Sequence, residues 1–171
     1  LVKGKTVGID ATTLEANAAM RSIVRNDTGA SYEQFLTQLA KASGIQTPTR
    51  EDLAKMDKSR KNKASNKDWH NPYDRDAKIA KMKDGRTHLA HKQEHAVDME
   101  SGAVLAVTIQ GADEGDTTSW RETVEQTCAN LNAVRGDEQA AKKVHDCSVE
   151  ELVEDKGYHS NQTMVDYREL G

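Results

Sequence analysis

The segment from Thr87 to Val134 contains two strand patterns followed by the clearest helix pattern in the chain. Apolar and polar residues alternate in "THLAHKQEHAVDM", and "GAVLAVTIQ" is a continuous apolar strand. The turn at Glu100, Ser101 and Gly102 between these two segments predicts a β-hairpin. An apolar stripe at helical spacing then predicts a helix over 117–134. A chain that changes from period 2 to period 3.6 in this way needs a sheet packed against a helix.

The remaining patterns place this hairpin inside an α/β layer fold. "KTVGIDATT" reads as a first strand, in which Asp10 points to the face opposite Val7 and Ile9. Two capped helices and a long loop follow, and "ELVED" and a helix over 160–170 complete the chain. The order is strand, long insertion, hairpin, helix, strand and helix, which favours a mixed sheet flanked by helices.

The charge of the chain is unevenly distributed. Hydrophobic residues make up 36% and the mean hydropathy is -0.82, so we expect part of the chain to pack poorly or to need a partner. From Lys55 to Lys92 there are 12 Lys or Arg and 5 Asp or Glu, whereas the other residues carry 12 and 23. A basic block in an acidic chain predicts contact with phosphate. The alternative is a solvated insertion without a ligand.

Cellular context is indicated by features that the sequence lacks. No apolar run is long enough to span a membrane, and the sequence does not open with a signal-peptide pattern. Cys128 and Cys147 are lone thiols without the spacing of a metal or redox motif. Because reduced thiols are typical of the cytosol, we expect a cytoplasmic protein.

Asp10 and Asp155 share a sequence context that is typical of metal ligands. Each follows apolar strand residues and precedes small or turn-forming residues. Carboxylates at the ends of adjacent strands converge and bind hard divalent cations through oxygen. Two such ions about 4 Å apart can activate the attacking oxygen and stabilise the leaving oxygen of a phosphodiester. Spacing alone makes this a weak signal, because aspartates at strand ends are common.

Three stretches resemble the DDE transposases of bacterial insertion sequences, which have a ribonuclease H-like catalytic domain. They are "GIDATTLEAN", "NPYDRDAKIAKMKDGRTHLAHKQEHAVD" and "EDKGYHSNQTMV", and the likeness covers nearly the whole chain. The resemblance implies that Asp10 and Asp155 are the first and second catalytic aspartates and bind Mg²⁺. It also implies hydrolysis and strand transfer at the transposon ends of double-stranded DNA, and a possible homodimer in the full-length protein.

The third carboxylate of that family is not matched here. It is a glutamate in a Tyr-x-x-Arg-x-x-x-Glu setting well downstream of the second aspartate, and Glu169 lies in "YREL" with the wrong spacing. We therefore expect an incomplete ribonuclease H-like core over 1–17 and 84–171, with a basic, partly helical insertion over 18–83. We also expect this chain to be inactive by itself. The alternatives are a non-catalytic DNA-binding remnant and, less favoured, a small zinc hydrolase.

Other polar residues have two interpretations each. His88, His91 and His95 would share a face on a helix and suit zinc, but on the strand that the alternation predicts, His88 points away from the other two. Asp116 is well placed to cap the helix that follows it, and a role facing the site is the second interpretation. Lys92 is expected either at the surface or in contact with DNA phosphate.

The remaining DNA-binding candidates lie in the basic block. A cluster of positive charge with nearby aromatic rings predicts binding to the DNA backbone, with Trp69 and Tyr73 as possible stacking groups. The candidate phosphate contacts are Lys58, Arg60, Lys61, Lys63 and Lys92.

Overall fold

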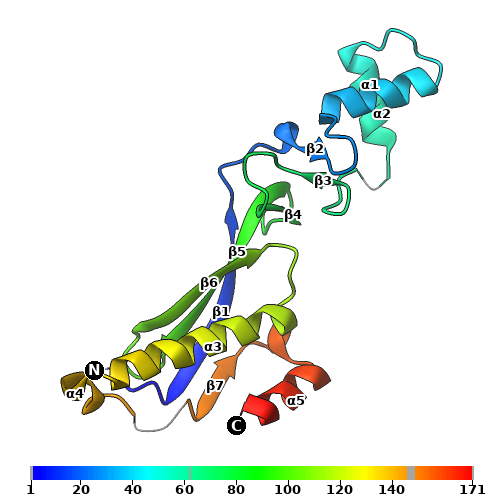
Figure 1. Ribbon diagram of the computed structural model, residues 1–171. Helices are drawn as coiled ribbons and strands as arrows, with labels where there is room; N and C mark the ends of the chain where they lie inside the picture. Colours follow the sequence, from blue (N-terminus) through cyan, green and yellow to red (C-terminus); the bar gives the residue numbers. More distant parts are fainter. Residues whose placement is uncertain (1, 62, 146–148, 171) are drawn as a thin grey trace. The chain divides into compact units, whose positions relative to one another are not determined.

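The structure is a computed structural model that describes residues 2–61, 63–145 and 149–170 (Figure 1). Within these residues it is an α/β protein with a five-stranded mixed sheet and five α-helices. Two short 3₁₀ turns and a separate two-stranded sheet complete it. In chain order the elements are β1 Thr6–Glu15, η1 Met20–Ser22, β2 Val24–Arg25, α1 Tyr32–Ala42, α2 Arg50–Ser59, β3 Trp69–His70, β4 Lys78–Lys81, β5 Thr87–Asp98, β6 Val104–Gly111, α3 Asp116–Arg135, α4 Glu138–Ala141, β7 Glu151–Glu154, η2 Lys156–Tyr158 and α5 Asn161–Leu170.

The large sheet has the order β4-β5-β1-β7, and β6 also pairs with β5. The β5–β6 hairpin is confirmed, and α3 follows it as the helical stripe predicts. The β1–β7 pair is parallel, with Thr6 opposite Glu151 and Ile9 opposite Glu154. The paired stretch ends at Ile9 and Glu154, so it is followed directly by Asp10, within β1, and by Asp155, just after β7.

The chain divides into two compact units. Unit 1 comprises Leu1–Leu14, Lys92–Gln110 and Glu114–Gly171, and unit 2 comprises Glu15–His91 and Gly111–Asp113. The division between the units falls after His91, eight residues beyond the end predicted for the insertion.

The core of unit 1 lies between one face of the sheet and the helices α3 and α5. Val7 and Ile9 of β1 are 0% and 3% exposed and belong to the same buried cluster as Trp120 of α3. Trp120 also meets Tyr167 of α5, with ring centroids 4.3 Å apart. Burial of these large side chains fixes the sheet face that carries Ile9 against the helices and leaves the face of Asp10 open.

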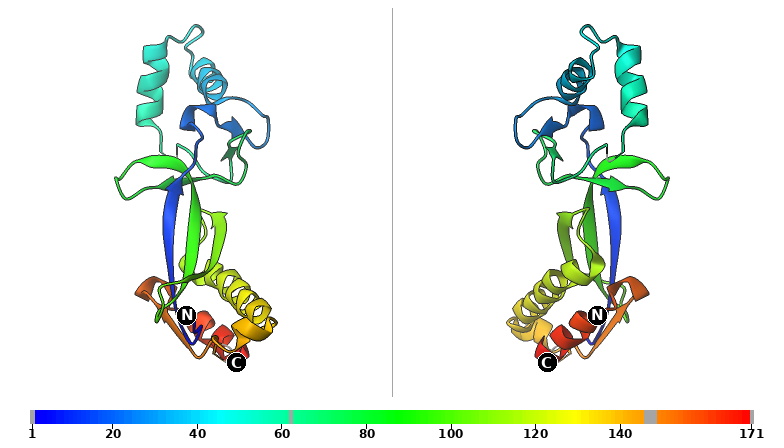
Figure 2. Two further views of the ribbon diagram at one scale, coloured as in Figure 1. Left: turned by 90° about the vertical axis from the view of Figure 1, so that its left-hand side faces the viewer. Right: turned by 90° about the vertical axis from the view of Figure 1, so that its right-hand side faces the viewer.

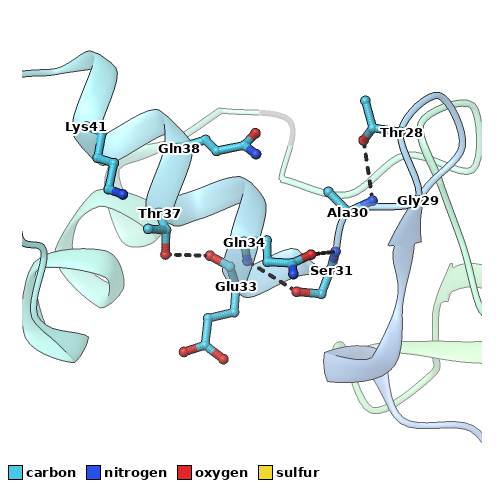
Figure 3. Close-up of a pocket in the computed structure, with 9 residues that line it drawn as sticks. All are labelled: Thr28, Gly29, Ala30, Ser31, Glu33, Gln34, Thr37, Gln38 and Lys41. Carbon is cyan, nitrogen blue, oxygen red and sulfur yellow. Dashed lines mark hydrogen bonds between the residues drawn. The ribbon is translucent and has the colours of Figure 1, made fainter.

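Unit 2 has a separate core around Trp69. Its helices α1 and α2 pack side by side (Figure 2). The predicted cap of α1 is confirmed: Ser31 Oγ accepts from the Gln34 N–H at 3.2 Å, and Gln34 Oε1 accepts from the Ser31 N–H at 2.9 Å (Figure 3). The Trp69 ring meets the rings of Tyr32 and Phe35 at 5.0 and 5.3 Å, which ties α1 to β3.

Two further expectations concern the thiols and the membrane. The Cys128 thiol is half-buried and free, and burial raises its pKa. Cys147 lies outside the described residues. None of the helices in the described ranges is long and apolar enough to cross a membrane.

Candidate functional site

Asp10 lies within β1, and Asp155 is the first residue after β7, the parallel neighbour of β1. Because Ile9 pairs with Glu154, the two aspartates are the next residues along the register. Both are exposed, and Asp10 lies on the face opposite Val7 and Ile9, as the alternation predicts. They line one open hollow, together with Gly8, Ile9, Ala11, Thr12, His95, Val97, Met99, Val153 and Glu154.

The turn after Asp155 is held by its own backbone and by a buried ring. Asp155 Oδ1 accepts from the Gly157 N–H at 2.5 Å, which fixes the carboxylate at the start of η2. Tyr158 is 1% exposed, so its ring anchors the turn in the core of unit 1. The turn that follows Asp155 is therefore anchored to the core of unit 1.

Asp116 lies beside this turn. A Cβ atom at Gly157 would be 2.8 Å from both Asp116 Oδ2 and Asp155 Oδ1, which is too close for any side chain without displacement. Glycine is therefore the residue that lets the two carboxylates approach the same point of the backbone. The interpretation of Asp116 as a helix cap was wrong, because Gly115 is the N-cap and α3 has no side-chain cap.

The carboxylate of Asp116 pairs instead with Lys92. The distance from Lys92 Nζ to Asp116 Oδ1 is 2.6 Å, and the Lys92 side chain is 6% exposed. The expectation that Lys92 is a surface lysine was therefore wrong, and its burial removes it from the candidate contacts to DNA phosphate. Its face of β5 is the covered one, where Glu94 and Asp98 are both 0% exposed.

Glu94 is the centre of a buried hydrogen-bond network that joins β5, α3 and the Asp155 turn. Its Oε1 accepts from Ser119 Oγ at 2.9 Å and from Tyr158 Oη at 3.0 Å, and its Oε2 accepts from Thr123 Oγ1. Lys92 Nζ lies 3.8 Å from Glu94 Oε1 and donates to Ser119 Oγ at 2.6 Å. The buried charge is thereby paired and hydrogen-bonded, as a carboxylate in a core requires.

The pKa of Tyr158 is raised in part by the negative charges around it. Burial, followed by the charge and hydrogen bond of Glu94 and the charges of Asp116 and Asp10, raises the pKa of Tyr158 far above its ordinary value. The hydroxyl is therefore protonated at any physiological pH and acts as a donor to Glu94. Tyr158 is the link between the buried network and the carboxylates at the surface.

Asp10 and Asp155 are the two exposed carboxylates that line the hollow of unit 1. Among the residues that the structure describes, no group of three or more His, Cys, Asp or Glu side chains is arranged to hold a metal ion. Mg²⁺ is commonly held by one or two carboxylates, with water and substrate phosphate completing its octahedron. Asp10 and Asp155 provide two such carboxylates on an open surface.

The histidines do not form a zinc site. They lie on a strand, as predicted, and each ring contacts a different side chain. His88 Nδ1 is 2.6 Å from Glu15 Oε1, His91 Nε2 is 3.1 Å from Asp74 Oδ2, and His95 Nε2 is 3.1 Å from Gln93 Nε2. The geometry gives the zinc hydrolase alternative no support.

The basic candidates of unit 2 divide into exposed and structural residues. Lys58, Lys61 and Lys63 are exposed at and after the end of α2. The side chain of Arg60 is 18% exposed; its guanidinium lies 3.4 Å from Asp57 Oδ1 and 4.9 Å from the ring centroid of Phe35. Arg60 therefore packs α2 against α1.

The two aromatic candidates differ in the same way. Trp69 is 3% exposed, so it cannot stack on a base, whereas Tyr73 is 90% exposed. Another hollow, this one in unit 2, lies at the start of α1, where the polar groups of Ser31 and Gln34 hydrogen-bond to each other (Figure 3).

Comparisons with protein-family models, curated proteins and solved structures found no match to this chain. The function is therefore inferred from the residues of the site itself. Lys92, Glu94 and Tyr158 were not identified as parts of this network from the sequence, because charged residues at alternate positions of a strand normally indicate its solvent face. The available signal was the position of Asp116, for which a role facing the site was one of two interpretations.

Proposed function

We propose that this chain acts in DNA transposition, with unit 1 as a ribonuclease H-like domain of the DDE transposase type. The reaction is metal-dependent hydrolysis and strand transfer of phosphodiesters at the ends of double-stranded DNA. The observation that supports the proposal is the pairing of β1 with β7, which ends at Ile9 and Glu154, the residues directly before the exposed Asp10 and Asp155. The resemblance of the sequence around these two aspartates gives the reaction class.

Asp10 and Asp155 would hold Mg²⁺ in this proposal. The ion would polarise the phosphate and favour ionisation of the attacking hydroxyl. The protein's own contribution would be positioning: the Gly157 N–H donates to the Asp155 carboxylate, and the pairing of β7 with β1 brings the backbone before Asp155 next to the backbone before Asp10. Such positioning matters because small displacements of reacting groups cost large factors in rate.

The charges of the two units support a division of labour. Unit 1 contains 9 Lys or Arg and 17 Asp or Glu, whereas unit 2 contains 15 and 11. An acidic unit attracts divalent cations but repels DNA, so phosphate contacts must come largely from cationic side chains elsewhere. The exposed residues Lys58, Lys61 and Lys63 of unit 2 are suited to that role.

A non-catalytic DNA-binding protein is the second candidate. The observation in its favour is that unit 2 is basic and has its own core around Ile23, Trp69 and Leu89. This candidate requires no function of Asp10 or Asp155, and metal binding therefore distinguishes the two proposals.

The test is a titration with Mn²⁺, whose free form gives a six-line electron paramagnetic resonance signal that weakens on binding. The intact chain should bind Mn²⁺ weakly, and Asp10→Asn and Asp155→Asn should each reduce the affinity by about tenfold or more, since each removes one of few ligands. The matched control is Asp76→Asn, which neutralises an exposed aspartate of unit 2 and should leave the affinity unchanged. Equal binding by all four proteins would refute the catalytic proposal.

A further inference from the structure

Lys92 is a buried cation whose shortest ionic contact is with a partly exposed carboxylate. Among the described residues, no other lysine or arginine is buried to the same degree. Its ammonium group lies 2.6 Å from Asp116 Oδ1 and 3.8 Å from the fully buried Glu94. The Asp116 side chain is 38% exposed, so the ammonium of a core residue is attached to a carboxylate at the edge of the site.

The Asp116 carboxylate also lies close to the turn that follows Asp155. Its other oxygen, Oδ2, and Asp155 Oδ1 are each 2.8 Å from the Cβ position of Gly157. One oxygen of Asp116 therefore pairs with Lys92, and the other lies beside Gly157, two residues after the proposed metal ligand Asp155. The positive charge of Lys92 is fixed one carboxylate away from that metal position.

We infer that Lys92 is a positioning residue whose ammonium group substitutes for a second cation in the carboxylate cluster of unit 1. By pairing with Asp116 it keeps that carboxylate from serving as a metal ligand, so the site takes one divalent cation through Asp10 and Asp155. The inference rests on the proposed function, because it assumes a metal at those two aspartates.

Burial of a lysine is energetically unfavourable. Removing an ammonium group from water is unfavourable, and a buried ion pair commonly contributes less stability than an apolar replacement would. Lysine supplies a compact charge with three donors, and here Asp116, Ser119 and Glu94 lie around it. A lysine needed only to neutralise Glu94 would make its closest ionic contact there, whereas the contact with Asp116 is shorter by more than 1 Å.

The decisive experiment measures the stoichiometry and affinity of Mn²⁺ binding in Lys92→Met. Methionine keeps the length of the side chain and removes its charge, so Asp116 becomes available to the metal. We expect a second bound Mn²⁺, or an affinity at least about fivefold higher, since an added carboxylate ligand and a lost positive charge both favour a cation. The control is Lys156→Met, which removes an exposed lysine from the Asp155 turn and should have a much smaller effect.

Asp116 variants separate positioning from simple removal of charge. Asp116→Asn alone should leave the affinity within about threefold of the original chain, because Lys92 already occupies that carboxylate. The double variant Lys92→Met with Asp116→Asn should lose the gain of Lys92→Met. If Asp116→Asn abolishes binding as Asp155→Asn does, Asp116 is a metal ligand and the inference is wrong.

Folding of each variant is checked by circular dichroism. If Lys92→Met does not fold, it is combined with Glu94→Gln, which removes the buried carboxylate together with its cation, and this protein is compared with Glu94→Gln alone. Binding that is unchanged by loss of Lys92 in a folded protein would overturn the inference and leave the proposed function intact. Absence of Mn²⁺ binding by the original chain would instead refute the proposed function itself.

Discussion

Replacement of Tyr158 by Phe tests whether the buried network holds the Asp155 turn. The change removes one hydroxyl, whose hydrogen bond to the fully buried Glu94 is 3.0 Å long. Hydrogen bonds to charged groups contribute about 1.5–3 kcal/mol, and loss of this one leaves a buried carboxylate with fewer donors. We therefore expect Tyr158→Phe to lower the free energy of unfolding of unit 1 by about that amount.

The assay is urea unfolding followed by tryptophan fluorescence. The chain has two tryptophans, and each lies in the core of a different unit. In a Trp69→Phe background, Trp120 is the single tryptophan and reports on unit 1. The matched control is Tyr73→Phe, which removes a hydroxyl from a side chain that is 90% exposed and should change the free energy by less than about 0.5 kcal/mol.

Equal unfolding midpoints for Tyr158→Phe and Tyr73→Phe would refute the reasoning. That result would mean that the Tyr158 hydroxyl does not stabilise the turn. Glu94 would then not stabilise the turn after Asp155 through Tyr158.

Three further predictions concern DNA binding, the helix packing of unit 2 and acid stability. If phosphate contacts provide most of the affinity for duplex DNA, the logarithm of the binding constant should fall linearly with the logarithm of the salt concentration, at a slope of roughly -4 to -5. Joint replacement of Lys58, Lys61 and Lys63 by Ala should reduce the magnitude of this slope by about 1 per lost contact. An unchanged slope would show that these lysines do not contact the DNA. Arg60→Ala should instead destabilise unit 2 by about 1–2 kcal/mol, measured by fluorescence of the tryptophan of unit 2, and a wholly stable variant would contradict its packing role. Burial acts to raise the pKa of Asp98, but hydrogen bonds from Ser101 and from backbone N–H groups outweigh it and hold the pKa below its ordinary value. The ionised form of Asp98 therefore stabilises the fold above about pH 4, and this stabilisation is lost as the pH falls through the lowered pKa. The difference in free energy of unfolding between the original chain and Asp98→Asn should therefore shrink from pH 7 to pH 3, and a constant difference would refute this assignment.

Local patterns were sufficient to predict several elements of the fold. The alternation around Val7 and Ile9 predicts both β1 and the open position of Asp10, because both follow from the two-residue period of a strand. The stripe through Trp120 and Val124 predicts α3, since a helix buries one face at a fixed spacing.

The same rules failed on β5, where the charged face is the buried one. Lys92 and Glu94 alternate with half-buried residues, which in sequence is typical of a solvent face. The face is buried because α3 presents the hydroxyls of Ser119 and Thr123 opposite it. These partners are 25 or more residues away, so tertiary contacts override the local pattern and no window of neighbouring residues reveals them.

The lysine contact of Asp116 was missed for a related reason. An aspartate at the start of a helix normally caps it, and the local sequence gives no indication of another partner. The pairing with Lys92 depends on how the helix lies against the sheet. Polar networks of this kind become visible only when the fold brings their members together.

The most direct test of the central claim is the position of a divalent cation in crystals grown with Mn²⁺. Anomalous diffraction locates Mn²⁺ independently of the surrounding atoms. We predict one peak within about 2–2.5 Å of carboxylate oxygens of both Asp10 and Asp155, with Lys92 still paired to Asp116. A peak elsewhere, or two carboxylates more than roughly 10 Å apart with no peak between them, would contradict the assignment of these aspartates as a shared metal site.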